Sequence, residues 1–232
     1  MSKLFDRQIL VQLVLVFAVM LSVKWMADQL EFIGAGSIAI WCAIITATLF
    51  MKRDGLTWRG FGLSLPKGRG QWLRQIGWGL LAMVAVFLLM GLVLAPLFGA
   101  LGFETPADAN DRFTFFLGKP VQFIGFLIVV IWFGAALGEE MLMRGFVLNH
   151  LATFLGESKI AWTAALIIHA TIFGVMHAYQ GVPGMIGTGL IGFVLGVFYL
   201  VGKRKLFPVV LAHGLINTIG LLGFYFTDGA MT

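Results

Sequence analysis

The fold is decided by the stretch Val121–Leu137, which reads VQFIGFLIVVIWFGAAL and contains no charged residue. A helix needs about 20 mainly apolar residues to cross a bilayer, because its backbone must satisfy its own hydrogen bonds there. Further stretches of the same character are Ile9–Trp25, Phe32–Met51, Ile76–Gly99, Ala161–His177, Pro183–Val201 and Phe207–Phe226. The sequence therefore predicts an all-α fold, a polytopic transmembrane helical bundle of about seven spans.

The composition of the chain supports this fold. Its 232 residues are 59% hydrophobic and 12% charged, whereas an ordinary soluble domain has roughly 25% charged residues. The net charge of +5 comes from basic residues spread over several loops between spans, without a basic domain that would hold a duplex. Membrane lipid is therefore the expected surrounding partner, and nucleic acid is not expected.

The N-terminal region resembles a signal peptide in one respect, since Lys3 and Arg7 precede an apolar run. No small-residue cleavage pattern follows it, so we expect a retained first helix. No linker separates a second unit, and residues 1–232 are expected to form a single membrane domain. The single cysteine, Cys42, lies within the second predicted span, which leaves no intrachain disulfide.

The basic residues also predict an orientation in the cell membrane. If the N-terminus is cytoplasmic, only Lys24, Arg112 and Lys119 fall on outer segments, and the remaining basic residues fall on inner ones. The positive-inside rule then predicts a multi-pass protein with its N-terminus inside and its C-terminus outside. The inner loop 52–75 mixes basic and aromatic residues, which suits either a segment lying on the membrane surface or a plain connection.

The most informative polar cluster reads GEEMLMRG at positions 138–145, directly after the apolar run. Each ionisable group within lipid costs roughly 2.5–3.5 kcal/mol on insertion scales, so such a cluster predicts a functional site. Glu140 and Arg144 stand four apart on one face of an α-helix and can form an ion pair. Glu139 points about 100° away and can accept a proton from water in a cavity. The alternative is a helix end with solvated charges.

Two further clusters contain histidine: FGVMH at 173–177 and HGLIN at 213–217. Glu139 and His177 are equally far along the chain from Ser158, within the polar break GESK. A hairpin turn there would bring both to one depth on neighbouring helices, and the hairpin would project beyond the inner lipid surface. His213 and Asn217 share a helix face and can donate to a developing oxyanion, or can form a helix-to-helix hydrogen bond.

Other polar residues have weaker signals. His150 and His169 have no motif and are expected to be packing or interfacial residues. Asn149, Thr171 and Tyr179 offer further polar groups near the clusters, although no spacing requires them there.

Three motifs, EExxxR at 139–144, FxxxH at 173–177 and HxxxN at 213–217, occur in one order on separate apolar stretches. This set resembles that of the CAAX prenyl protease and bacteriocin-processing (CPBP) family of intramembrane endopeptidases, and the resemblance covers residues 115–226. It implies that Glu139 and His177 activate water while His213 and Asn217 stabilise the oxyanion. Glu140 and Arg144 complete the first motif.

The resemblance leaves the metal and the substrate open. The family is often labelled as metalloproteases, and two histidines with a glutamate can hold a divalent metal such as zinc, but the sequence has no HExxH helix. We expect water activated by glutamate without a metal. The substrate class implied is a membrane-anchored or lipidated peptide, with prenylated tails, leader peptides, bacteriocin precursors and protein-sorting tails all open. Two alternatives remain: a non-catalytic immunity, regulatory or chaperone protein, and a small proton-coupled transporter.

Overall fold

The computed structural model describes residues 3–103, 106 and 110–229, which are helical almost throughout and contain no strand. Its α-helices are α1 (Lys3–Gln29), α2 (Ala35–Arg53), α3 (Arg69–Leu88), α4 (Ala95–Ala100), α5 (Pro120–Phe126), α6 (Asn149–Phe154), α7 (Lys159–Val175), α8 (Gly181–Val201) and α9 (Leu206–Phe226). Within the described residues, six continuous helices are long and apolar enough to cross a membrane, and α7 is a shorter apolar helix. The prediction of an all-α bundle of about seven spans is confirmed.

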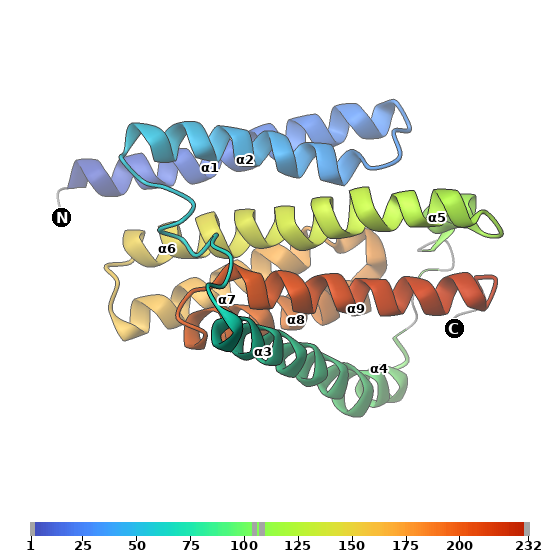
Figure 1. Cartoon of the computed structure of the whole chain (residues 1–232). Coiled ribbons are helices and arrows are strands. Elements are labelled where there is room, and N and C mark those ends of the chain that lie inside the picture. The colour runs from blue at the N-terminus through green and yellow to red at the C-terminus, as the bar shows by residue number, and fades with distance from the viewer. Residues whose placement is uncertain (1–2, 104–105, 107–109, 230–232) are drawn as a thin grey trace.

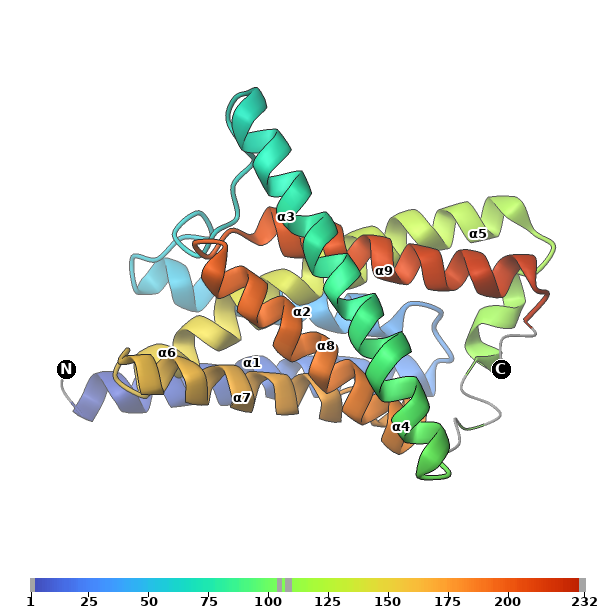
Figure 2. The ribbon, with the colours of Figure 1, turned by 90° about the horizontal axis from the view of Figure 1, so that it is seen from below.

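The helices form layers that Figure 1 shows edge on. The hairpin of α1 and α2 covers one side of the continuous helix Pro120–Phe154, and α7, α8 and α9 lie on its other side. Figure 2 shows α3 crossing obliquely over α8 and α9. The most closely packed pairs are α1 with α2, α7 with α8, and α3 with α9. The two termini lie at opposite ends of the bundle, as an odd number of spans requires.

The turn between α6 and α7 has the place that the polar break predicted. Ser158 caps α7, and its hydroxyl accepts a hydrogen bond from the Ala161 backbone N–H at 3.1 Å, a favourable arrangement at a helix N-terminus. This hairpin extends further along the bundle than the turn from α8 into α9 (Figures 1 and 2). The expectation that this hairpin projects beyond the inner lipid surface stays a prediction.

Part of the loop between α2 and α3 packs against the bundle, although most of its residues are exposed. The Trp58 indole donates to the Thr48 hydroxyl at 2.9 Å, and a β-carbon at Gly145 would lie 3.2 Å from the Trp58 ring. Gly62 has a φ of +96°, and a β-carbon there would overlap the Arg204 carbonyl oxygen. The apolar groups of Trp58 and Phe61 pack against the helical core, and the choice between a segment on the membrane surface and a plain connection stays open.

Candidate active site

The helix that carries the first motif is not an ordinary α-helix. Its segments η3 (Leu127–Glu139) and η4 (Met141–Leu148) are π-helical, with i→i+5 hydrogen bonds. Such helices are rare, normally a single turn long, and frequent at functional sites. The spacing of 100° expected between Glu139 and Glu140 is wrong for this segment, because that value assumes 3.6 residues per turn.

Glu140 and Arg144 form the predicted ion pair. Arg144 Nη1 lies 2.9 Å from Glu140 Oε1, and both side chains are fully buried. Nη2 of the same guanidinium donates to the Gly192 carbonyl of α8 at 3.0 Å, and its carbon lies 4.8 Å from the centre of the Phe173 ring of α7. Arg144 therefore joins three helices. Removal of one member of such a pair leaves an uncompensated buried charge.

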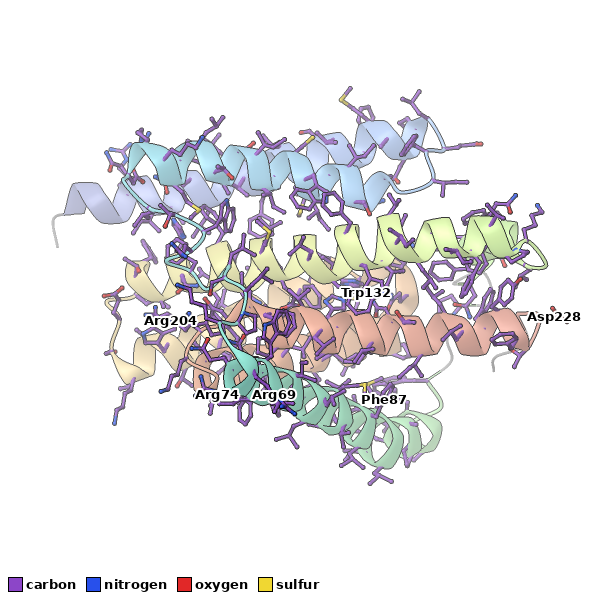
Figure 3. All side chains as sticks on the ribbon, viewed as in Figure 1. Arg69, Arg74, Phe87, Trp132, Arg204 and Asp228 are labelled. Atoms are coloured by element: carbon purple, nitrogen blue, oxygen red, sulfur yellow. The ribbon has the colours of Figure 1, made fainter. Side chains whose placement is uncertain are left out.

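His213 of α9 lies between the two glutamates. Its Nδ1 is 2.8 Å from Glu140 Oε1, and its Nε2 is 4.0 Å from Glu139 Oε2. A carboxylate can only accept a hydrogen bond, so Nδ1 carries the proton in this contact and Nε2 faces Glu139. The close approach of α9 depends on Gly214, where a β-carbon would lie 2.6 Å from the Trp132 ring of η3. Figure 3 shows Trp132 between this helix and α9.

His177 belongs to the same cluster through Phe173. Helix α7 ends at Val175, two residues before the end predicted for this span, and His177 lies in the turn that follows. Its Nδ1 donates to the Phe173 carbonyl at 2.8 Å. The Phe173 ring has its centre 4.9 Å from the His177 ring and 6.4 Å from the His213 ring. One aromatic side chain thus touches groups from all three motifs.

Residues 120–219 match the family model described as Type II CAAX prenyl endopeptidase Rce1-like. The match confirms the resemblance over this Rce1-like segment, which contains all three motifs. No curated protein and no solved structure matches the chain in the same comparisons. Helices α1, α2 and α3 lie outside the matched residues.

Two predicted catalytic residues in the Rce1-like segment, Asn217 and Glu139, make fewer contacts than the others. Asn217 lies one helical turn beyond His213 on α9 and is half-buried, and within the described part of the chain its amide has no hydrogen-bond partner. Glu139 is 13% exposed at its side chain, and no hydrogen bond or ion pair between the described residues joins it to His177. The structure therefore brings Glu139, Glu140, Arg144 and His213 together, with His177 adjacent through Phe173.

The cluster has unused hydrogen-bonding capacity. Within the described residues, Glu139 Oε2, Glu140 Oε2 and Arg144 Nε are buried and have no hydrogen-bond partner. Each such atom costs roughly 1–3 kcal/mol when it stays unpaired, so native structures retain few of them without a functional reason. The described residues contain no group of three His, Cys, Asp or Glu side chains arranged to hold a metal ion.

An apolar groove of about 360 Å³ lies between α7 and α8. Its lining includes Ala170, Gly174, Gly189 and Phe193, and it does not include Glu139. The expectation that Glu139 faces a cavity therefore stays a prediction.

His169 and His150 are buried, as expected for packing residues. His150 Nδ1 donates to the Phe146 carbonyl at 2.9 Å. Both ring nitrogens of His169, in contrast, have no partner among the described residues, and the ring lies parallel to Phe173, with centres 6.5 Å apart. Sequence reasoning missed this unpaired imidazole, since only the packing of α7 against Gly196 of α8 encloses it.

Proposed function

We propose that this protein is an endopeptidase that hydrolyses a peptide bond within the membrane by means of glutamate-activated water. The observation that carries the proposal is the position of His213, which contacts Glu140 at 2.8 Å and approaches Glu139 to 4.0 Å. An imidazole that contacts one carboxylate and lies near a second, among apolar helices, can supply the proton acceptor and donor that hydrolysis needs. The family match supports the same reaction class.

In the proposed reaction, Glu139 removes a proton from water as the water oxygen attacks the scissile carbonyl carbon. The carbonyl oxygen becomes an oxyanion, which accepts hydrogen bonds from His213 and Asn217. His213 donates through Nε2 of a protonated ring, because its Nδ1 is engaged with Glu140. His177 protonates the leaving amine, or it orients the water while the proton taken up by Glu139 passes to the amine. The C–N bond then breaks to give a carboxylic acid and an amine.

The proposed reaction uses no metal. The Glu140 carboxylate already accepts from Arg144 and His213, and the guanidinium 2.9 Å away repels a second cation at the same carboxylate. A zinc site built from Glu139, His177 and His213 has three ligands and an open position in principle. Among the described residues, however, no hydrogen bond or ion pair joins His177 to Glu139, and His177 meets His213 only through the Phe173 ring.

We propose a membrane-anchored or lipidated peptide as substrate and membrane lipid as the surrounding partner. The apolar groove between α7 and α8 supports this choice, because a lipid chain attached to the peptide would find an apolar surface there. In this proposal the chain is a single domain in which residues 115–226 form the catalytic helices.

We also propose that the protein lies in the cell membrane with its N-terminus in the cytoplasm. Arg69, Arg74 and Arg204 gather near one end of the bundle, and Asp228 lies at the other (Figure 3). The positive-inside rule supports a cytoplasmic location for the end rich in arginine.

The test is cleavage of a fluorogenic peptide library by purified protein in proteoliposomes, with and without a chelator. We expect Glu139→Gln to lower the cleavage rate about 10²–10⁴-fold, the usual contribution of a general base. Glu157→Gln, at an exposed glutamate in the α6–α7 turn, is the matched control and should cleave normally. Equal cleavage by Glu139→Gln and wild type would contradict the proposal, and a rate abolished by chelator and restored by zinc would overturn its metal-free form.

A further inference from the structure

A second buried polar cluster lies at the opposite end of η4 from Glu140. Asn149 is 2% exposed and Tyr199 of α8 is fully buried. The Asn149 amide nitrogen lies 2.7 Å from the Arg144 carbonyl oxygen, 3.0 Å from the Gly145 carbonyl oxygen and 2.9 Å from the Tyr199 hydroxyl. That hydroxyl donates in turn to the Phe61 carbonyl at 3.0 Å. None of these contacts takes part in the proposed reaction.

The two carbonyl groups held by Asn149 mark a change in helix type. Segment η4 ends at Leu148 and α6 begins at Asn149, so the backbone pattern changes there from i→i+5 to i→i+4 hydrogen bonds. A side chain that bonds to carbonyls four and five residues earlier competes with the backbone pattern. Asn149 therefore fixes the residue at which the π-helix ends.

Three other segments converge on Asn149 and hold it in place. The side-chain oxygen Oδ1 of Asn149 accepts a hydrogen bond from Arg204 Nη1 at 3.3 Å. Arg204 lies in the turn between α8 and α9. The Tyr199 hydroxyl connects Asn149 to the loop of residues 58–62 through its hydrogen bond to the Phe61 carbonyl. In the same loop, the Trp58 ring packs against Gly145. The amide thus has partners on α8, on the α8–α9 turn and on η4 itself, and the Tyr199 hydroxyl is the buried link to the loop.

We propose that Asn149 and Tyr199 are positioning residues for the peptidase reaction, because they hold the register of the π-helical segment that carries the first motif. This inference rests on the proposed function. Asn149 contacts the backbone of Arg144, whose guanidinium pairs with Glu140 and lies over Phe173. A shift of the backbone at Arg144 would therefore move Glu140 and, through His213, the geometry at Glu139.

The test compares Tyr199→Phe with Tyr225→Phe. The first removes one buried oxygen and keeps the ring, and the second removes a hydroxyl from a half-buried tyrosine whose ring stacks on Phe123. Because a misplacement of about 1 Å can cost on the order of 10²-fold in rate, we expect Tyr199→Phe to lower kcat roughly 10- to 100-fold. KM should change less than about twofold, and Tyr225→Phe should leave both constants unchanged.

Amide hydrogen exchange gives a readout that does not depend on activity. Exchange across residues 144–152 should be faster in Tyr199→Phe than in wild type and unchanged in Tyr225→Phe, because a weakened cluster opens locally more often. Unchanged exchange in Tyr199→Phe would overturn the positioning role whether or not the protein cleaves peptides. Unchanged kcat in Tyr199→Phe, with wild-type cleavage that depends on Glu139, would overturn it without touching the proposed function.

Discussion

The α1–α2 hairpin and the helix Pro120–Phe154 are both long and apolar, yet they are built differently. Helix α2 is α-helical throughout, and its buried face repeats Ala39, Ala43 and Ala47 at intervals of four residues. The helix Pro120–Phe154 is largely π-helical and buries the Glu140–Arg144 ion pair. Crossing a membrane thus requires only apolar length and small contact residues, whereas the polar cluster requires a distorted helix and partners from three others.

The largest difference should appear when a cation is removed from each region. Arg144→Met leaves Glu140 buried without its cation, and we expect a loss of roughly 3–5 kcal/mol in the free energy of unfolding. Arg53→Met at the end of α2 removes a pair with Asp54 whose side chains are 56% and 24% exposed, and such pairs contribute about 0–1 kcal/mol. Thermal unfolding in detergent measures both, and losses of equal size would remove the distinction between the regions.

A smaller effect should appear where the two regions meet. A β-carbon at Gly134 of η3 would lie 2.1 Å from the hydroxyl oxygen and 2.7 Å from the β-carbon of Ser37 on α2. We expect Gly134→Ala to cost roughly 1–3 kcal/mol through overpacking. Ser37→Gly in the same chain should recover most of that loss.

Gly36→Ala provides the control, because a β-carbon at Gly36 meets no atom within 4 Å. Unfolding measurements that find Gly134→Ala and Gly36→Ala equally stable would show that α2 and η3 are not in close contact.

The smallest effect should come from the unpaired imidazole. His169→Leu replaces two buried ring nitrogens that have no hydrogen-bond partner among the described residues by an apolar group of similar size. We expect the free energy of unfolding to rise by about 1 kcal/mol or to stay unchanged. The Glu139-dependent cleavage rate should persist, since His169 has no contact with the carboxylates. A loss of cleavage in a variant that folds normally would assign His169 a role that the structure does not give it.

Much of the fold follows from composition and spacing. Apolar length predicted the spans, the break at Ser158 predicted the α6–α7 turn, and the four-residue spacing predicted the Glu140–Arg144 pair. All three depend on residues close together in the chain, where helix geometry alone decides which groups can meet. The predicted span was two residues too long, because the chain leaves the α-helix at Val175 and forms a turn in which the His177 backbone N–H donates to the Gly174 carbonyl.

The sequence could not predict the contacts that join distant helices. The π-helical segments have no distinctive periodicity in an apolar run, and their register depends on partners such as Tyr199 and Phe61. The contact between His213 and Glu140 links residues far apart in the chain, so the motifs predicted a shared site without showing which carboxylate His213 touches. The roles of His177 and Asn217 in the reaction stay predictions.

The central claim is that Glu139 activates the water that cleaves the substrate peptide. Its most direct test is a single-turnover cleavage in proteoliposomes containing ¹⁸O-labelled water, with wild type and Glu139→Gln compared at equal amounts of folded protein. The account predicts one ¹⁸O atom in the new carboxyl group, formed about 10²–10⁴-fold more slowly by Glu139→Gln. Labelled product formed at the same rate by both proteins would contradict it.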